Sequence, residues 1–154
     1  MDLKYINIYN NLVNLTRNKD LYKNYSNQDT FSDRLIFFLL HFSFFLKNFK
    51  SDENRKVLQE IYDYIFRQLD LSIREIGYGD QSINKKMKIY LNLFHEMIDK
   101  LDSWEKKSIN EKRSTLQHFI NNSFDDDYFV NYFEKYRLDL SNNTLNYQIK
   151  SVVR

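Results

Sequence analysis

The chain has 154 residues, of which 42% are hydrophobic and 29% charged, and its formal net charge is +2. This apolar content is enough to close one hydrophobic core, which argues against intrinsic disorder over most of the length. The charge is too small to indicate nucleic-acid binding by itself, and the absence of Cys excludes disulfides, thiolate metal sites and Cys nucleophiles.

The first predicted helix lies near the N-terminus. Apolar residues between Tyr5 and Val13 recur at steps of three and four, which predicts one apolar stripe on a helix. A polar break follows at residues 24–29, and Thr30 or Ser32 is expected to cap a second helix.

The second predicted helix, residues 35–49, is apolar on all sides, which is typical of the centre of a bundle. Its run of apolar residues, 35–46, is interrupted by His41 and Ser43. That run falls short of the roughly 18 to 20 residues that cross a bilayer. We therefore expect a buried central helix, with His41 as a core residue that makes one hydrogen bond.

The third predicted helix begins at Ser51 and Asp52, because short oxygen side chains cap free N–H groups. Its apolar stripe runs over residues 58–76 and ends at Gly77. Glycine most readily adopts the left-handed conformation just past a helix end. Gly77 and Gly79 are therefore predicted to form a structural turn between two helices.

Two further helices follow this turn. Asp80 or Ser82 is expected to cap the fourth, which is predicted to run to about Trp104. Ser108 is expected to begin the fifth, with apolar residues up to Ile120 facing inward.

A sixth helix is predicted from Ser123 and the acids 125–127, with the aromatic residues of 128–133 packing inward. Residues 140–154 are expected to form either a frayed last helix or a mobile tail. The connectors are short and polar, and the chain has no Pro and two Gly. The sequence thus predicts one all-α domain over 1–154, a compact bundle of about five to six helices.

The sequence offers no constellation typical of catalysis or metal binding. His41, His95 and His118 lie far apart, and no pair has the i, i+4 spacing of a helical metal site. The acids 125–127 are typical of a helix start, and Gly77 with Gly79 follows a helix rather than the strand of a phosphate-binding loop. We therefore expect no enzyme, no bound metal and no cofactor.

Positive charge gathers just after the predicted turn, at Lys85, Lys86 and Lys88, with Arg74 across it. Two interpretations remain open: a solvated helix face, or a docking patch for an acidic or phosphate-rich partner.

Residues 69–88, LDLSIREIGYGDQSINKKMK, resemble the central motif of the ubiquinol–cytochrome c chaperone family. The matching positions are Asp70, Ser72, Arg74, Glu75, Gly77, Gly79, Asp80, Ser82, Lys85 and Lys88. Residues 30–34, with the Leu-His pair that ends at His41, are similar to an earlier helix of the family, and Thr16-Arg17 with Tyr22 to its first segment. Asn84 departs from the pattern, in which Gly is common.

The resemblance implies an all-helical assembly factor for respiratory complex III that binds newly made cytochrome b (apo-cytochrome b) without catalysing a reaction. It also implies a small helical co-chaperone, work near the ribosome and peripheral association with the membrane, and no DNA partner. A composition typical of an AT-rich genome, without an import leader, indicates a bacterial cytoplasmic protein at the inner face of the cytoplasmic membrane. An organellar member would act on the matrix side of the mitochondrial membrane.

The partner-binding residues are expected where the resemblance is densest, at Arg74, Glu75, Asp80, Ser82, Lys85, Lys86 and Lys88. Exposed ion pairs stabilise a fold by only about 0–1 kcal/mol each, so fold maintenance does not explain the cluster. The alternative function is a ribosome- or RNA-docking module that uses Lys85, Lys86 and Lys88.

Overall fold

The computed structural model describes residues 3–22, 31–77, 79–120 and 127–152. These residues contain no strand, and they form a compact bundle of seven α-helices with two short 3-10 helices. The α-helices are α1 (Ile6–Thr16), α2 (Phe31–Phe49), α3 (Arg55–Glu75), α4 (Asp80–Leu101), α5 (Ile109–Phe119), α6 (Tyr128–Ser141) and α7 (Leu145–Lys150). The 3-10 helices are η1 (Lys19–Leu21) and η2 (Trp104–Lys106). The all-α prediction is confirmed, with more helices than the five to six expected.

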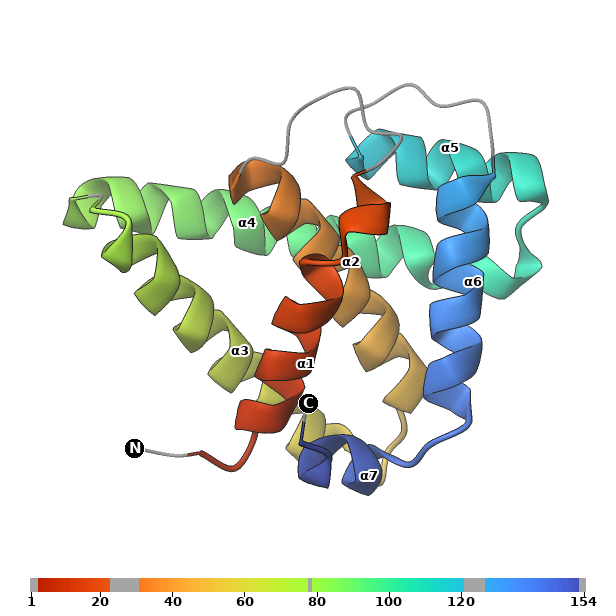
Figure 1. Cartoon of the computed structure of the whole chain (residues 1–154), viewed down its shortest axis with the longest axis horizontal. Helices are drawn as coiled ribbons and strands as arrows, with labels where there is room; N and C mark the ends of the chain where they lie inside the picture. Colours follow the sequence, from red (N-terminus) through yellow and green to blue (C-terminus); the bar gives the residue numbers. More distant parts are fainter. Residues whose placement is uncertain (1–2, 23–30, 78, 121–126, 153–154) are drawn as a thin grey trace.

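Helix α2 occupies the centre of the bundle, as its all-round apolar sequence predicts. Helices α1, α4 and α6 pack around it (Figure 1), and every residue of 37–45 is buried. Helix α3 leaves this centre and meets α4 at a corner on the left of the view.

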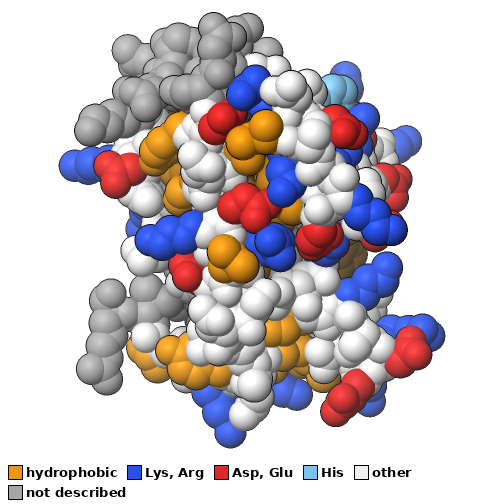
Figure 2. All heavy atoms as spheres, turned by 90° about the vertical axis from the view of Figure 1, so that its right-hand side faces the viewer, with side chains coloured by type: hydrophobic (Ala, Val, Ile, Leu, Met, Phe, Trp, Pro, Cys, Tyr) orange, Lys and Arg blue, Asp and Glu red, His pale blue; other side chains and the backbone are white. Residues whose placement is uncertain are grey.

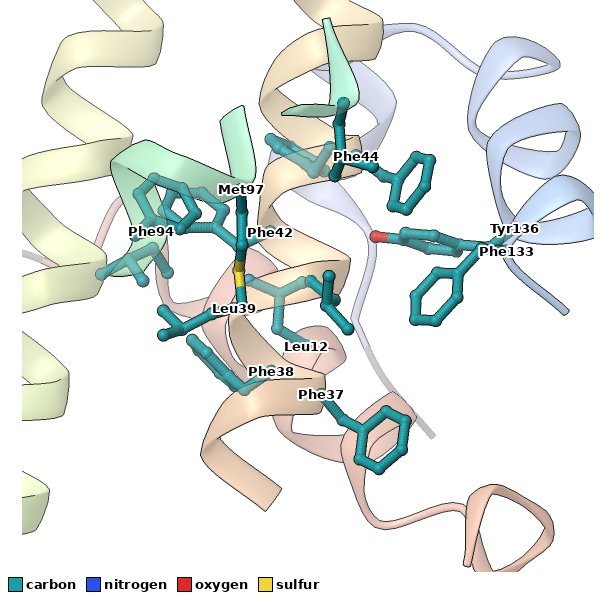
Figure 3. Close-up of a cluster of buried hydrophobic side chains, with 14 of the residues drawn as sticks. Leu12, Phe37, Phe38, Leu39, Phe42, Phe44, Phe94, Met97, Phe133 and Tyr136 are labelled. Atoms are coloured by element: carbon teal, nitrogen blue, oxygen red, sulfur yellow. The ribbon is translucent and has the colours of Figure 1, made fainter. Parts of the chain in front are cut away.

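Aromatic rings join α2 to its neighbours. Phe42 stacks on Phe94 of α4 with ring centroids 5.2 Å apart, and Phe44 stacks on Phe133 of α6 at 5.1 Å. Trp104 of η2 meets Phe44 edge-on at 5.2 Å. Figure 3 shows the Phe42 and Phe94 rings on one side of α2, and Phe44 directed toward α6 on the other. Such ring pairs stabilise the core beyond the area that they bury.

Helix α6 is also held by a half-buried carboxylate. The Glu134 carboxylate accepts hydrogen bonds from Trp104 Nε1 at 2.6 Å, Lys112 Nζ at 2.8 Å and Arg137 Nη2 at 2.9 Å. These three donors lower the pKa of Glu134 despite its partial burial. Figure 2 shows the face over α5 and α6, where basic and acidic side chains are interspersed and hydrophobic side chains form separate spots. Among the described residues of this face, charged and other polar side chains therefore separate the hydrophobic ones.

The predicted helix starts are confirmed at α5 and wrong at α3 and α4. Ser108 caps α5, because its Oγ accepts from Glu111 N–H and the Glu111 carboxylate accepts from Ser108 N–H, both at 3.2 Å. The start of α3 is Arg55 rather than Ser51, whose Oγ accepts from the N–H of Asn54 at 3.2 Å and so caps a preceding turn.

Helix α4 is preceded by Gly79, so Asp80 and Ser82 lie within its first turn and neither is the cap. Ser32 likewise lies inside α2, which begins one residue earlier, while Thr30 lies outside the described residues.

The fourth and sixth predicted helices also differ in extent. Helix α4 ends at Leu101, and Trp104 belongs to a separate 3-10 helix. Helix α6 follows Asp127, which makes no side-chain capping bond, while Ser123, Asp125 and Asp126 lie outside the described residues.

Residues 140–152 include a last helix, α7, which contacts α1. Thr144 caps α7, with its Oγ1 accepting from Tyr147 N–H at 3.0 Å. The side chain of Asn7 in α1 donates to the Ile149 carbonyl at 3.1 Å. Of the two alternatives for this segment, a last helix is confirmed. None of the described helices combines the length and hydropathy that a membrane span requires.

Candidate functional site

The corner between α3 and α4 depends on one glycine. Gly77 has φ +101°, in the left-handed region, and its N–H donates to the Arg74 carbonyl at 3.0 Å. It thus ends α3 as predicted. Gly79 has φ −72°, which any residue adopts. Only Gly77 therefore needs the conformational freedom of glycine.

Arg74 ties the two helices of this corner together. Its Nε donates to Asp70 Oδ1 at 3.1 Å, and its Nη1 reaches across the turn to Asp80 Oδ1 at 2.7 Å. The hydrogen bond to Asp80, with Asp70 nearby, raises the pKa of Arg74, which therefore stays charged. Arg74 and Asp80 thus bind each other at the surface, and solvent limits what such a pair adds to stability.

The other predicted site residues lie at the end of α3 and in the first three turns of α4. Glu75, Ser82, Lys85 and Lys88 are exposed, and Lys86 is half-buried. Lys85 and Lys88 are one turn apart on the solvent side of α4 and make no ion pair with another described residue. Of the seven predicted residues, the structure therefore joins Arg74 and Asp80 across the turn, while Lys85 and Lys88 are exposed in the following turns of α4.

The three histidines lie apart. His41 is fully buried, and its Nδ1 donates to the Phe37 carbonyl at 2.6 Å while its Nε2 accepts from Tyr132 Oη at 2.6 Å. Burial lowers its pKa to about 4. His41 is thus a core residue, with two hydrogen bonds rather than the one expected.

His95 contacts Tyr62 Oη at 3.3 Å, and His118 contacts Glu96 Oε1 at 2.7 Å. No group of His, Asp and Glu able to hold a metal ion occurs within the described parts of the chain.

A groove that the sequence analysis did not predict lies between the C-terminal half of α2, the N-terminal half of α3 and the C-terminal half of α4. Its volume is about 770 Å³, within the range of protein ligand sites. Leu46, Leu58, Tyr62 and Ile98 contribute partly exposed apolar surface to it. This surface is suited to non-covalent binding of apolar side chains. We refer to it below as the α2–α4 groove.

The rim of the α2–α4 groove carries charges of both signs. Lys47 pairs with Glu105 at 3.0 Å, and Arg55 with Asp52 at 3.1 Å. Lys50 and Asp102 also line it. Because the charges are largely balanced, the rim presents no strong electrostatic field of one sign.

The sequence pattern assigns the apolar residues of this groove to the buried stripes of their helices. Leu58 and Tyr62 are four residues apart on α3, a spacing that is equally typical of a core face. Their partial exposure follows only from how α2, α3 and α4 are placed, because α3 diverges from the bundle toward the corner (Figure 1).

Comparison with known proteins matches the chain to a protein family. The family model described as Ubiquinol-cytochrome C chaperone matches residues 23–126, more than half of the chain. No curated protein and no solved structure matches the chain.

Proposed function

Because the chain belongs to the Ubiquinol-cytochrome C chaperone family, we propose that it is a non-enzymatic assembly factor that binds newly made cytochrome b during biogenesis of the cytochrome bc1 complex. Family membership implies a client protein. Which client this is, and where it binds, are the finer parts of the proposal.

The observation that carries the client-binding proposal is the α2–α4 groove. A newly made membrane protein exposes apolar segments that must be shielded until they reach their partners. Leu46, Leu58 and Ile98 offer such segments an apolar surface, and helices that bind in grooves use apolar contacts of this kind. Binding of this type is non-covalent, which agrees with a role as chaperone rather than enzyme.

The place of action is a further part of the proposal. We propose that the protein works at the face of the membrane where cytochrome b is synthesised. In a bacterium this is the inner face of the cytoplasmic membrane, and in an organelle it is the matrix side. A small helical co-chaperone is the expected partner.

The test is affinity capture of cytochrome b from native membrane and soluble fractions. Leu58→Gln and Ile98→Gln should reduce the captured cytochrome b several-fold, because each places an amide on the apolar surface of the groove. The matched controls are Leu71→Gln on α3 and Ile89→Gln on α4, whose side chains are 46% and 54% exposed and lie outside the groove. Equal capture by groove and control variants would contradict the proposal, as would capture of no cytochrome b by the unaltered protein.

A second function is favoured by the charged corner, namely docking on the ribosome or RNA through Lys85, Lys86 and Lys88. The exposure of Lys85 and Lys88 on the solvent side of α4 supports it. Docking on nucleic acid releases counterions, so the affinity should fall steeply as salt is added. Client binding in the apolar groove should persist at high salt. Sedimentation with ribosomes at increasing salt therefore separates the two functions, which can coexist in one protein.

A further inference from the structure

Most of the polar and charged side chains that line the α2–α4 groove already have a partner within the protein. Hydrogen bonds involve Ser43, Ser51, Gln59, Tyr62 and His95, and the ion pairs described above involve Lys47, Asp52 and Arg55. A ligand can bind these groups only by sharing or replacing a contact that the fold already makes. Their capacity for new bonds is therefore partly used.

Two charged side chains of the groove differ from the rest. Lys50 and Asp102 make no side-chain hydrogen bond or ion pair with any residue of the described ranges. Both are exposed, and they belong to different walls, since Lys50 follows the end of α2 and Asp102 follows the end of α4. The groove thus offers a partner one positive and one negative charge in addition to its apolar surface.

The position of Asp102 is not explained by the stability of its own helix. Asp102 is the C-cap of α4, where the helix dipole places partial negative charge, so a carboxylate is unfavourable there. A cation from a bound partner would offset this repulsion. Lys50, in contrast, complements the dipole at the end of α2, and its ammonium group can also pair with a carboxylate of the partner.

The size of the groove limits how much of a partner it can hold. Sites for drug-sized ligands typically measure about 300–1,000 Å³, so about 770 Å³ suits a few side chains rather than the helix of about 20 residues that spans a bilayer. A wholly apolar span would also leave Lys50 and Asp102 without partners, and a nucleic acid or an anionic lipid has no cation for Asp102. An amphipathic polypeptide segment that carries an acid and a base beside its apolar residues meets these requirements.

We propose that the α2–α4 groove binds an amphipathic segment of its partner rather than a membrane-spanning one. The segment places a carboxylate at Lys50, a Lys or Arg side chain at Asp102, and apolar side chains on Leu46, Leu58 and Ile98. In a membrane protein, amphipathic segments of this kind lie at the membrane surface. This inference rests on the proposed function, because it takes the groove as the client site, and it specifies which part of the client is bound.

The test is fluorescence anisotropy of the full chain with four labelled, helix-forming peptides. All four share one stripe of Leu among Ala and Gln, and they differ only in the two residues that flank the stripe: Glu and Lys, Gln and Gln, Glu and Glu, or Lys and Lys. The Glu/Lys peptide should bind about two- to fivefold more tightly than the Gln/Gln peptide, because exposed ion pairs are individually weak. Ile98→Gln should weaken the binding of all four, which places them in the groove.

Charge reversal in the protein should exchange the preferred peptide. Lys50→Glu should bind the Lys/Lys peptide most tightly, and Asp102→Lys the Glu/Glu peptide. Both sites are exposed, so the urea midpoints should stay close to that of the unaltered protein. The matched controls are Lys56→Glu and Asp99→Lys, which change the net charge equally at exposed sites outside the groove and should keep the preference for the Glu/Lys peptide.

Four results would overturn the proposal: equal binding of the four peptides, no binding of any, an unchanged ranking in either charge variant, or the same exchange of preference in the controls. Sedimentation of the chain with phosphatidylethanolamine vesicles that is lost in both charge variants would also overturn it, because the groove would then bind a zwitterionic lipid. Capture of cytochrome b, which tests the proposed function, is read separately. Failure of the peptide ranking therefore rejects the amphipathic segment and leaves the result of that capture unchanged.

Discussion

At the centre of the bundle, Phe42 and Phe44 lie fully enclosed between stacked rings of α4 and α6, whereas at the α3–α4 corner Arg74 and Asp80 pair in contact with solvent. Burial of a large aromatic side chain stabilises a fold by several kcal/mol, while an exposed ion pair contributes about 0–1 kcal/mol. The centre therefore supplies most of the stability of the fold, and charged residues at the corner can be substituted with little loss of stability. A surface of that kind is suited to contacts with other molecules.

The largest expected effect on stability comes from truncating an aromatic side chain at the centre of the bundle. Phe44→Ala removes a ring that contacts both Phe133 and Trp104, and it should lower the free energy of unfolding by about 3–5 kcal/mol. Urea denaturation measures this loss. The matched control Ile89→Ala, at an exposed site on α4, should change stability by less than about 0.5 kcal/mol. A loss below about 1 kcal/mol for Phe44→Ala would mean that the centre is not the stabilising region.

A second effect concerns the buried histidine of this centre. Burial lowers the pKa of His41 from its ordinary 6.5 to about 4, so between these pH values the unfolded chain binds the proton and the folded chain does not. Stability should therefore fall as the pH decreases from 6.5 and level off below 4. The pKa difference corresponds to a total loss on the order of 3 kcal/mol.

Urea midpoints at successive pH values test this expectation against two variants. His41→Gln should remove this part of the pH dependence, while His118→Gln, at an exposed site, should retain it. An unchanged pH profile in His41→Gln would show that the acid sensitivity has another origin.

A smaller effect is expected at the two glycines of the corner. An added Cβ meets no atom within 4 Å at either position, so only backbone conformation distinguishes them. Gly77→Ala should cost about 1–2 kcal/mol because φ is positive there, and Gly79→Ala less than about 0.5 kcal/mol. Thermal unfolding of both variants checks the difference. Equal melting temperatures would show that the left-handed conformation at Gly77 is not required.

The smallest effect on stability is expected at the lysines of the corner. Lys85→Glu/Lys88→Glu should change the free energy of unfolding by less than about 0.5 kcal/mol, because both side chains are exposed. The same variant should weaken association with a partner protein or the ribosome. Lys106→Glu/Lys135→Glu, with two exposed lysines elsewhere, is the control. Two results would contradict a binding role for the corner: the Lys85→Glu/Lys88→Glu variant unfolds, or it co-purifies with the same amount of partner as the unaltered protein.

Periodicity in the sequence was sufficient to predict α1 to α6, because each buried stripe follows the helical repeat, whereas it left α7 open. The burial of α2 and the place of His41 in the core follow from a helix that is apolar on all sides. The end of α3 was predictable because Gly77 is the residue type that tolerates a positive φ. The caps were less predictable, since Ser51, Asp80 and Ser82 each have a side chain able to cap a nearby helix.

Features that depend on the relative placement of helices could not be predicted from the sequence. The bond between Arg74 and Asp80 requires the turn that brings the end of α3 to the start of α4. The α2–α4 groove exists because α3 diverges from α2, which leaves Leu58 and Ile98 partly exposed although their spacing is that of core residues. Sequence patterns report which face of a helix is apolar, and tertiary packing decides how much of that face is covered.

The most direct test of the proposed function is photo-crosslinking during synthesis of cytochrome b. A photoreactive phenylalanine analogue is placed at position 58, in the α2–α4 groove, or at position 71, on the same helix outside it. If the groove holds the client, crosslinks to newly made cytochrome b should form from position 58 and not from position 71. Crosslinks from position 71 alone, or none from position 58, would contradict the proposal that the groove binds this client.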